Sequence, residues 1–268
     1  MTTIDMTFCS ELIRTVGARI HETSKQNLRL STFEEIFAEI QAMNTWVIDT
    51  LRAEVSVRYP SIPWSDSELD VDQQQQAEYA REYWICDPLD GALHYIQGFA
   101  LYAFSLCLVR DGKPAASFVY DPCSQELFHA VAGEGAYLNG QPIHVSQKKG
   151  LANAYVTTSL PSRPAEDAES AELTVRGIAQ VMPKAMAVKM LGSVSLQLAY
   201  VACGKLDGYW EFGSHYYDWL AGALLVQEAG GTVSDSKGNP FTWGTSGIIA
   251  SHREVFDQLS AELKGIQA

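Results

Sequence analysis

The spacing of apolar residues predicts two long helices near the start of the chain. Between Phe33 and Val55 apolar side chains recur every three or four residues, which is the period of a helix with one buried face. A weaker stripe of the same kind predicts a helix over residues 3–20. Tyr59-Pro60 would end the second helix, and the polar residues 61–80 predict an exposed loop. A loop of that length is typical of a lid or binding loop.

After Tyr83 the pattern changes to short apolar runs separated by turn residues. The runs at 83–86, 99–109, 115–120 and 127–131 are typical of an antiparallel meander of strands. A glycine-rich turn region at 133–140 follows, and residues 142–150 predict a seam between two halves. We therefore expect an N-terminal α+β half over residues 1–146 and a C-terminal α/β half over residues 147–268.

Strand and helix patterns alternate beyond the seam, which indicates strands covered by helices. The predicted strands are 155–158, 187–191, 206–210, 232–233 and 247–250, and the predicted helices are 193–203, 218–229 and 253–263.

The sequence has no run of 18 apolar residues and no signal-peptide pattern, and its five cysteines are scattered without zinc-site spacing. These features predict a cytoplasmic protein.

Charge narrows the classes of partner. The 268 residues include 19 Lys and Arg against 32 Asp and Glu, a formal net charge of −13 at pH 7. This acidic excess argues against nucleic acid and against an anionic membrane surface, because both attract basic proteins. An acidic chain still binds a small anion where its carboxylates hold divalent cations that face that anion. The places where carboxylates converge are therefore the candidate sites.

The densest chemical signal is the segment Trp-Ile-Cys-Asp-Pro-Leu-Asp-Gly at residues 84–91. Asp87 and Asp90 stand three residues apart around Pro88, so both carboxylates can point at one spot, and the Leu89 carbonyl can join them. Mg²⁺ prefers oxygen ligands of this kind. From these residues alone, turn formation or helix capping is the more common role of two such aspartates.

Two later segments add candidates. Asp218 stands where an amphipathic helix begins, as a helix cap or as a ligand. Gly192-Ser193 ends a strand and opens a helix, where backbone N–H groups can receive a phosphate oxygen.

Together these segments resemble the inositol monophosphatase superfamily of Mg²⁺-dependent, lithium-sensitive phosphomonoesterases. The family motif W-I-x-D-P-[LI]-D-G-T corresponds to residues 84–92, and the segments at 98–99, 119–122, 135–140, 191–193 and 218–223 match in order and spacing. The resemblance implies a layered αβαβα sandwich with its site at the junction of the two halves. It also implies a homodimer that acts on a small phosphorylated substrate.

The resemblance further implies a role for each matching residue. The expected Mg²⁺ ligands are Glu68, Asp87, the Leu89 carbonyl, Asp90 and Asp218, of which Glu68, Asp87 and Asp90 form the catalytic set. The expected substrate-binding residues are Asp90, Gly91, Ala92, Gly192, Ser193, Glu211 and Asp218. Glu211 would bind a substrate hydroxyl, unless it is a solvated carboxylate at a strand end. His94 and His215 are expected to be pocket walls or core residues rather than general bases.

Three positions depart from the family pattern, two where the attacking water would be activated and one near the metal site. The threonine after Asp-Gly is Ala92, which has neither donor nor acceptor. The water-activating glutamate falls on Ser67, although a shift of one residue could bring Asp66 or Glu68 into the site. A family aspartate becomes Asn44. The sequence therefore predicts a Mg²⁺-dependent phosphatase of a small phosphomonoester such as an inositol phosphate. The alternatives are a catalytically weakened member that acts as a metal-binding, phosphate-binding or regulatory protein, or a purely structural match.

Overall fold

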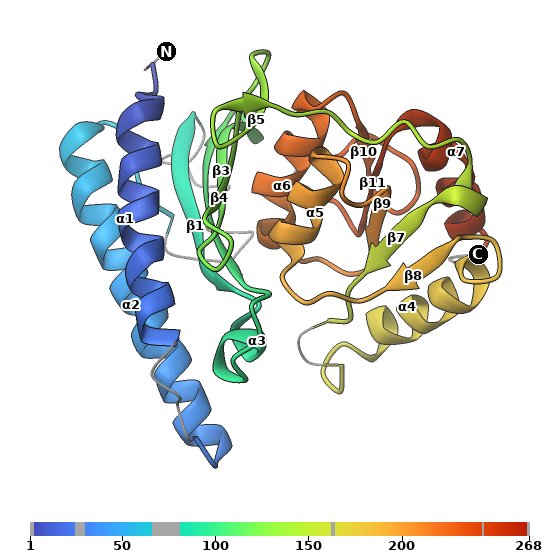
Figure 1. The fold of residues 1–268 in the computed structure, drawn as a ribbon, viewed down its shortest axis with the longest axis horizontal. Coiled ribbons are helices and arrows are strands. Elements are labelled where there is room, and N and C mark those ends of the chain that lie inside the picture. The colour runs from blue at the N-terminus through green and yellow to red at the C-terminus, as the bar shows by residue number, and fades with distance from the viewer. Residues whose placement is uncertain (1–2, 25–29, 66–80, 162–163, 243, 267–268) are drawn as a thin grey trace.

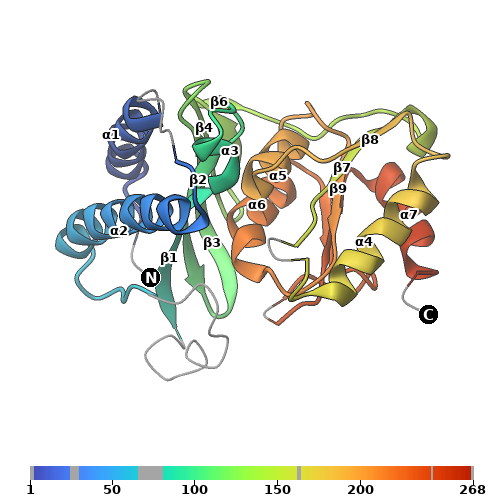
Figure 2. The same cartoon turned by 90° about the horizontal axis from the view of Figure 1, so that it is seen from below.

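The computed structural model describes residues 3–24, 30–65, 81–161, 164–242 and 244–266. Its elements stack in five layers, in which two helices, a sheet, two helices, a second sheet and two further helices follow one another (Figures 1 and 2). This arrangement confirms the predicted αβαβα sandwich.

Helices α1 (Met6–Ser24) and α2 (Phe33–Arg58) cover the outer face of the first sheet (Figure 1). Their buried residues recur at helical spacing, with Cys9, Ile13, Val16 and Ile20 on α1 and Met43, Val47, Leu51 and Val55 on α2. A capping box starts α2, because the Thr32 side chain accepts from the Glu35 N–H while the Glu35 side chain accepts from the Thr32 N–H. The helix ends at Tyr59, where the sequence predicts its end.

The first sheet is the predicted antiparallel meander. Its strands follow chain order: β1 (Glu82–Asp90), β2 (Ala103–Arg110), β3 (Lys113–Asp121), β4 (Glu126–Val131), β5 (Gly135–Leu138) and β6 (Gln141–Pro142). Strand β5 lies inside the region that the sequence predicts as a turn. The pairing of β1 with β2 shifts register between Asp87 and Asp90, around Pro88, which cannot donate to the ladder. The bent end of β1 leads through Gly91 into the short helix α3 (Ala92–Ile96).

Helices α5 (Val194–Ala202) and α6 (Tyr216–Glu228) form the central layer between the two sheets (Figure 2). Eight of the nine residues of α5 are buried. A helix that is apolar all round is one that is covered on all sides. The apolar sequences of α5 and α6 therefore fit their central place, whereas α1 and α2 each bury one stripe.

The second sheet has the order β10 (Thr232–Ser234), β11 (Ile248–Ser251), β9 (Gly208–Glu211), β7 (Tyr155–Thr158) and β8 (Ala187–Lys189). Strand β7 runs parallel to β8 and β9, and the remaining pairs are antiparallel. The 3-10 helix η3 (Leu151–Asn153) precedes β7, and α4 (Ala168–Val181) and α7 (Arg253–Lys264) cover the outer face. The sequence pattern does not predict α4. Within the described ranges, no helix combines the length and apolarity needed to cross a membrane.

Candidate active site

Asp90 joins the end of β1 to the first turn of α5. Its Oδ2 accepts from the Ser193 hydroxyl at 2.8 Å, the Ser195 hydroxyl at 2.5 Å and the Ser195 N–H at 2.6 Å, and its Oδ1 accepts from the Val194 N–H at 3.0 Å. The N-terminus of a helix favours a negative charge, both through its free N–H groups and through its dipole. The structure thus brings a predicted metal ligand into direct contact with the predicted phosphate cradle, 103 residues away in sequence.

The surroundings of Asp90 act on its pKa in opposite directions. Burial raises the pKa of this carboxyl above its usual value, whereas the hydroxyl and N–H donors of Ser195 and Ser193 lower it. Three of the four donors use Oδ2, so Oδ1 keeps one lone pair that has no partner among the described residues. A free carboxylate lone pair in a buried site suits a hard cation such as Mg²⁺.

Two glycines allow the close approach of β1, α3 and α5. Gly91 has a φ of +83°, and a Cβ there would lie 2.9 Å from the Leu101 carbonyl oxygen and 3.2 Å from the Ser193 Cβ. Gly192 has a φ of +91°, and a Cβ there would lie 2.4 Å from the His94 ring. The predicted cradle residues Gly91, Gly192 and Ser193 are therefore neighbours, and His94 forms a wall beside them. Ala92, the first residue of α3, follows Gly91 directly.

Glu211, the last residue of β9, is 2% exposed. Its Oε2 accepts from the Tyr209 hydroxyl and from the Trp219 Nε1–H, both at 2.6 Å. Burial raises the pKa of Glu211 to about 7, although both donors lower it, and the negative charge of Asp90 raises it further. Glu211 is thus a buried carboxylate held by two donors rather than a solvated one, and neither donor uses its Oε1.

Two other expected ligands, Asp87 and Asp218, lie on β1 and on α6. Asp87 is half-buried in β1 and accepts from the Leu89 N–H at 3.3 Å, and half-buried Asp218 lies in the first turn of α6. Within the described part of the chain, no three His, Cys, Asp or Glu side chains are grouped closely enough to hold a metal ion. Asp66, Ser67 and Glu68 lie outside the described residues. The donor types fit Mg²⁺.

Comparisons with known proteins identify the family. The sequence model of the inositol monophosphatase family matches residues 2–267. The chain belongs to the inositol monophosphatase family. It is 40% identical over 158 residues to the Nus factor SuhB of Xylella fastidiosa. This alignment covers 59% of this chain and 56% of that protein. It is 33% identical over 180 residues to the inositol-1-monophosphatase of Mesorhizobium japonicum, covering 67% of this chain and 66% of that protein.

A solved structure extends the likeness to nearly the whole chain. The crystal structure of the extragenic suppressor protein suhB from Bartonella henselae has a TM-score of 0.80 and 26% sequence identity, and the match covers 97% of this chain and 98% of that one. The fold of that protein therefore matches nearly the whole of this chain, whereas the two curated relatives are aligned over less than two thirds of their length.

Asn44 is the residue that the sequence resemblance places at the position of a family aspartate. It lies half-buried on α2, and its Oδ1 is buried without a hydrogen-bond partner among the described residues. A buried polar atom of this kind is uncommon and is often satisfied by water or an ion.

Three residues that the sequence pattern does not single out hold the candidate site together. Ser195 donates twice to Asp90, and Tyr209 and Trp219 fix Glu211. Trp219 resembles an ordinary core residue of α6, and Ser195 sits in an apolar helix. A polar or amphipathic residue inside an otherwise apolar central helix is the signal that could have found them, because buried donors need partners.

His215 sits beside Trp219 rather than on the Asp90 cluster. Its ring meets Trp219 edge-on at 6.3 Å between centroids, and burial lowers its pKa. This place agrees with the expectation of a wall residue.

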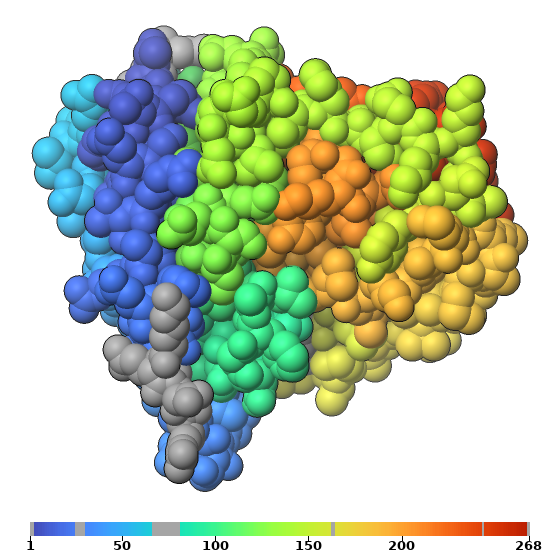
Figure 3. Space-filling view, in the orientation of Figure 1, coloured from blue at the N-terminus to red at the C-terminus, as the bar shows by residue number. Residues whose placement is uncertain are grey.

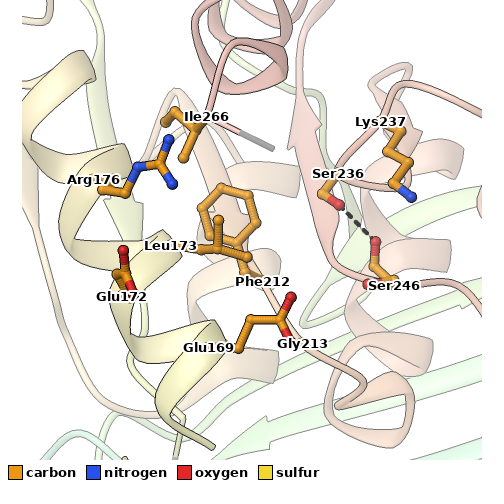
Figure 4. Close-up of a pocket in the computed structure, with 10 residues that line it drawn as sticks. All are labelled: Glu169, Glu172, Leu173, Arg176, Phe212, Gly213, Ser236, Lys237, Ser246 and Ile266. Carbon is orange, nitrogen blue, oxygen red and sulfur yellow. Dashed lines mark hydrogen bonds between the residues drawn. The ribbon is translucent and has the colours of Figure 1, made fainter. Parts of the chain in front are cut away.

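A separate cavity of about 370 Å³ lies beside α4, on the outer face of the second sheet (Figure 4). Leu173, Phe212 and Ile266 provide its apolar lining, and Arg176 and Lys237 lie at opposite sides. The predicted site residues do not line this cavity, although Phe212 directly follows Glu211.

On the face shown in Figure 3, α3 is exposed between α2 and the second half of the chain.

Proposed function

We propose that this inositol monophosphatase family member is a Mg²⁺-dependent phosphatase of a small phosphomonoester, with an inositol monophosphate as the best-fitting class. The observation that carries the proposal is the contact of Asp90 with Ser193 and the first turn of α5. It joins a cation-binding carboxylate to N–H and O–H donors of the kind that bind phosphate. Membership of the family supports the same chemistry.

In this proposal Mg²⁺ is held by Glu68, Asp87, the Leu89 carbonyl, Asp90 and Asp218. The bound cation would neutralise phosphoryl charge and lower the pKa of a water molecule. Asp87, Asp90 and Glu68 make up the catalytic set. No protein nucleophile is needed, because the attacking group is water.

The remaining site residues bind and orient the substrate. Gly91, Ala92, Gly192 and Ser193 surround the phosphate, which approaches closely because both glycines lack a Cβ. Glu211 Oε1 accepts a hydrogen bond from a hydroxyl of the alcohol portion of the substrate, while Tyr209 and Trp219 fix the carboxylate through Oε2. Asp90 and Asp218 complete the pocket wall on the substrate side.

The test is phosphate release from a panel of inositol phosphates, sugar phosphates and 3′-phosphonucleotides at saturating Mg²⁺. We expect release that disappears with a chelator and in Asp90→Asn, with folding of both proteins checked by circular dichroism. Folded wild-type protein that releases no phosphate from any member of the panel would remove the proposal.

A second candidate function is metal-dependent phosphate binding or regulation with weakened turnover. Ala92 favours it, because the family pattern places a hydroxyl that orients the water at this position. Asn44 favours it too, because the family pattern places an aspartate near the metal site there, and the Asn44 Oδ1 has no hydrogen-bond partner among the described residues. The name Nus factor for the relative from Xylella fastidiosa also favours a role other than turnover. This candidate predicts that Mg²⁺ and phosphate bind while the panel gives no release.

The proposal includes the partners and the location. The protein would be a cytoplasmic homodimer whose partner is a small phosphorylated molecule, and its net charge of −13 argues against nucleic acid and membranes. Light scattering after size exclusion tests the dimer. A filter-binding assay with RNA tests the expected absence of nucleic-acid binding.

A further inference from the structure

Gln197 is a buried amide beside the turn that opens α5. It is the fourth residue of that helix and is 1% exposed. Its Nε2 donates to the Gly192 carbonyl oxygen at 3.0 Å, to the Ser193 carbonyl oxygen at 3.3 Å and to the Ser159 Oγ at 3.0 Å. Two of these partners are carbonyl oxygens, which only accept, so the contacts require the NH2 side of the amide to face the turn. The Gln197 side chain therefore holds the backbone of two predicted cradle residues.

The Gly192 carbonyl fixes the direction of the Ser193 N–H. Both groups belong to one planar trans peptide unit, in which the C=O and the N–H point in opposite directions. Because the Gly192 carbonyl is turned toward Gln197, the Ser193 N–H is turned away from Gln197. The Ser193 nitrogen lies 3.3 Å from the place that a Cβ on Gly91 would take. The hold on the carbonyl thus presents the N–H on the side of the turn where Gly91 approaches.

The Ser193 N–H differs from the other donors at this end of α5. The N–H groups of Val194 and Ser195 both donate to Asp90. The Leu196 N–H donates to the Ser193 Oγ. In the described part of the chain, the Ser193 N–H has no hydrogen-bond acceptor. It is therefore the backbone donor of this turn that stays available to a bound anion.

The other end of the Gln197 amide adds nothing to the packing of the core. Its Oε1 is buried and has no hydrogen-bond partner among the described residues. A buried acceptor without a partner lowers the stability of a folded protein. An apolar side chain of similar length would avoid this cost in a helix that is buried on nearly all sides. What the NH2 group holds therefore explains the glutamine better than core stability does.

We propose that Gln197 is a positioning residue for the substrate phosphate, because its NH2 group holds the Gly192 carbonyl inward and so directs the Ser193 N–H at the phosphate. This inference rests on the proposed function, which places the phosphate among Gly91, Gly192 and Ser193. It adds a residue that acts through the backbone of the cradle rather than by contact with the phosphate or the cation.

The first experiment measures the dissociation constant of radiolabelled inorganic phosphate by equilibrium dialysis at one saturating concentration of Mg²⁺. Gln197→Met keeps an unbranched side chain of similar length and removes the NH2 group. It should raise the dissociation constant about tenfold, since a hydrogen bond to a charged group is of that strength. An unchanged dissociation constant would overturn the proposal.

Two control variants separate the hold on the carbonyls from a general disturbance. Ser159→Ala removes one acceptor of the Gln197 amide and leaves both carbonyl acceptors, so its dissociation constant should stay close to that of wild type. Gln227→Met makes the same exchange at an exposed position of α6 and should also bind phosphate as wild type does. A rise in Ser159→Ala equal to that in Gln197→Met would contradict the proposal.

The second experiment follows the Ser193 amide itself. In ¹H–¹⁵N spectra recorded with Mg²⁺, phosphate should shift the Ser193 resonance of wild type and leave that of Gln197→Met nearly unchanged. The urea midpoint of Gln197→Met should stay close to wild type, because the exchange removes an unpartnered acceptor together with the NH2 group. Equal shifts in both proteins would overturn the proposal, and so would a variant that fails to fold, since Gln197 would then serve the core.

The two proposals fail in different ways. If wild type binds phosphate, Gln197→Met binds it more weakly and the panel gives no release, the positioning role stands and the phosphatase function is wrong. If wild type hydrolyses a phosphomonoester and Gln197→Met binds phosphate as wild type does, the function stands and the positioning role is wrong. A wild-type protein that binds no phosphate would remove both.

Discussion

Trp219 donates its indole N–H to Oε2 of Glu211 at 2.6 Å, and both residues are buried. The indole belongs to the first turn of α6 and the carboxylate to the end of β9, so the bond ties the central helical layer to the second sheet. Tyr209 donates to the same oxygen from the strand itself. The result is a carboxylate held through Oε2, whose Oε1 has no hydrogen-bond partner in the described part of the chain.

Replacing Trp219 with phenylalanine should destabilise the protein by about 1–3 kcal/mol, because a hydrogen bond to a buried carboxylate is lost. The measurement is the free energy of unfolding in urea. Trp210→Phe is the matched control, since the Trp210 Nε1 is buried without a hydrogen-bond partner among the described residues. Both changes reduce ring size in a core position, so an equal cost for the two variants would mean that the Trp219 bond adds nothing.

Glu211 should make stability depend on pH. Its pKa is raised from 4.5 to about 7 in the folded protein, so the folded state holds the proton more tightly than the unfolded state. The stabilisation is therefore fully present below pH 4.5 and is lost as pH rises to about 7. A shift of this size corresponds to about 3 kcal/mol.

Glu211→Gln removes the titrating group and keeps a hydrogen-bond acceptor. Urea unfolding in chelator at several values between pH 4.5 and 8 should show wild type losing about 3 kcal/mol relative to this variant across the interval. Parallel pH profiles for the two proteins would show that Glu211 does not titrate with a raised pKa.

The sequence predicts most of the fold because most elements bury apolar residues at a regular spacing. Helix α4 is the exception, because its buried residues are not a stripe of large apolar side chains. Its buried residues Ser170, Thr174, Gly177 and Val181 have helical spacing, but three of the four are small or polar, so no hydrophobic stripe marks the helix. Small side chains let α4 lie close to the second sheet, where a Cβ on Gly177 would come within 3.0 Å of the Trp210 Nε1.

The contact between Asp90 and Ser193 joins two segments that the sequence singles out, but the contact itself was not predictable. The motif at residues 84–91 and the Gly192-Ser193 pair can be read locally, because each is a turn with its own residue pattern. The hydrogen bonds between Asp90 and Ser195 depend on how the end of β1 meets α5, 105 residues later in the chain. Only tertiary packing sets that relationship.

Gly192→Ala should destabilise the protein by about 2–4 kcal/mol, through its positive φ and through a contact of the new methyl with His94. Two variants separate these causes in urea unfolding. Gly133→Ala has a φ of +81° and nothing within 4 Å of the new Cβ, so it should show only the backbone cost of about 1–2 kcal/mol. In a His94→Ala background the cost of Gly192→Ala should fall to that same value, and an unchanged cost would show that His94 is not the obstacle.

The final prediction concerns turnover. Ala92→Thr together with Ser67→Glu restores the two side chains that the family pattern places at the attacking water, a hydroxyl and a carboxylate. General-base assistance of this kind is worth about 10²–10⁴ in rate. We expect the double variant to release phosphate from inositol monophosphate at Mg²⁺ saturation faster than wild type by a factor in that range.

Ala92→Val with Ser67→Gln is the control for this experiment, because it adds nearly the same volume without a hydroxyl or a carboxylate. It should be no faster than wild type. If the control accelerates the reaction as much as Ala92→Thr with Ser67→Glu, the gain comes from packing at the start of α3 rather than from water activation. If wild type is already fast and the double variant no faster, Ala92 does not weaken catalysis, and the water must be oriented by other groups of this chain.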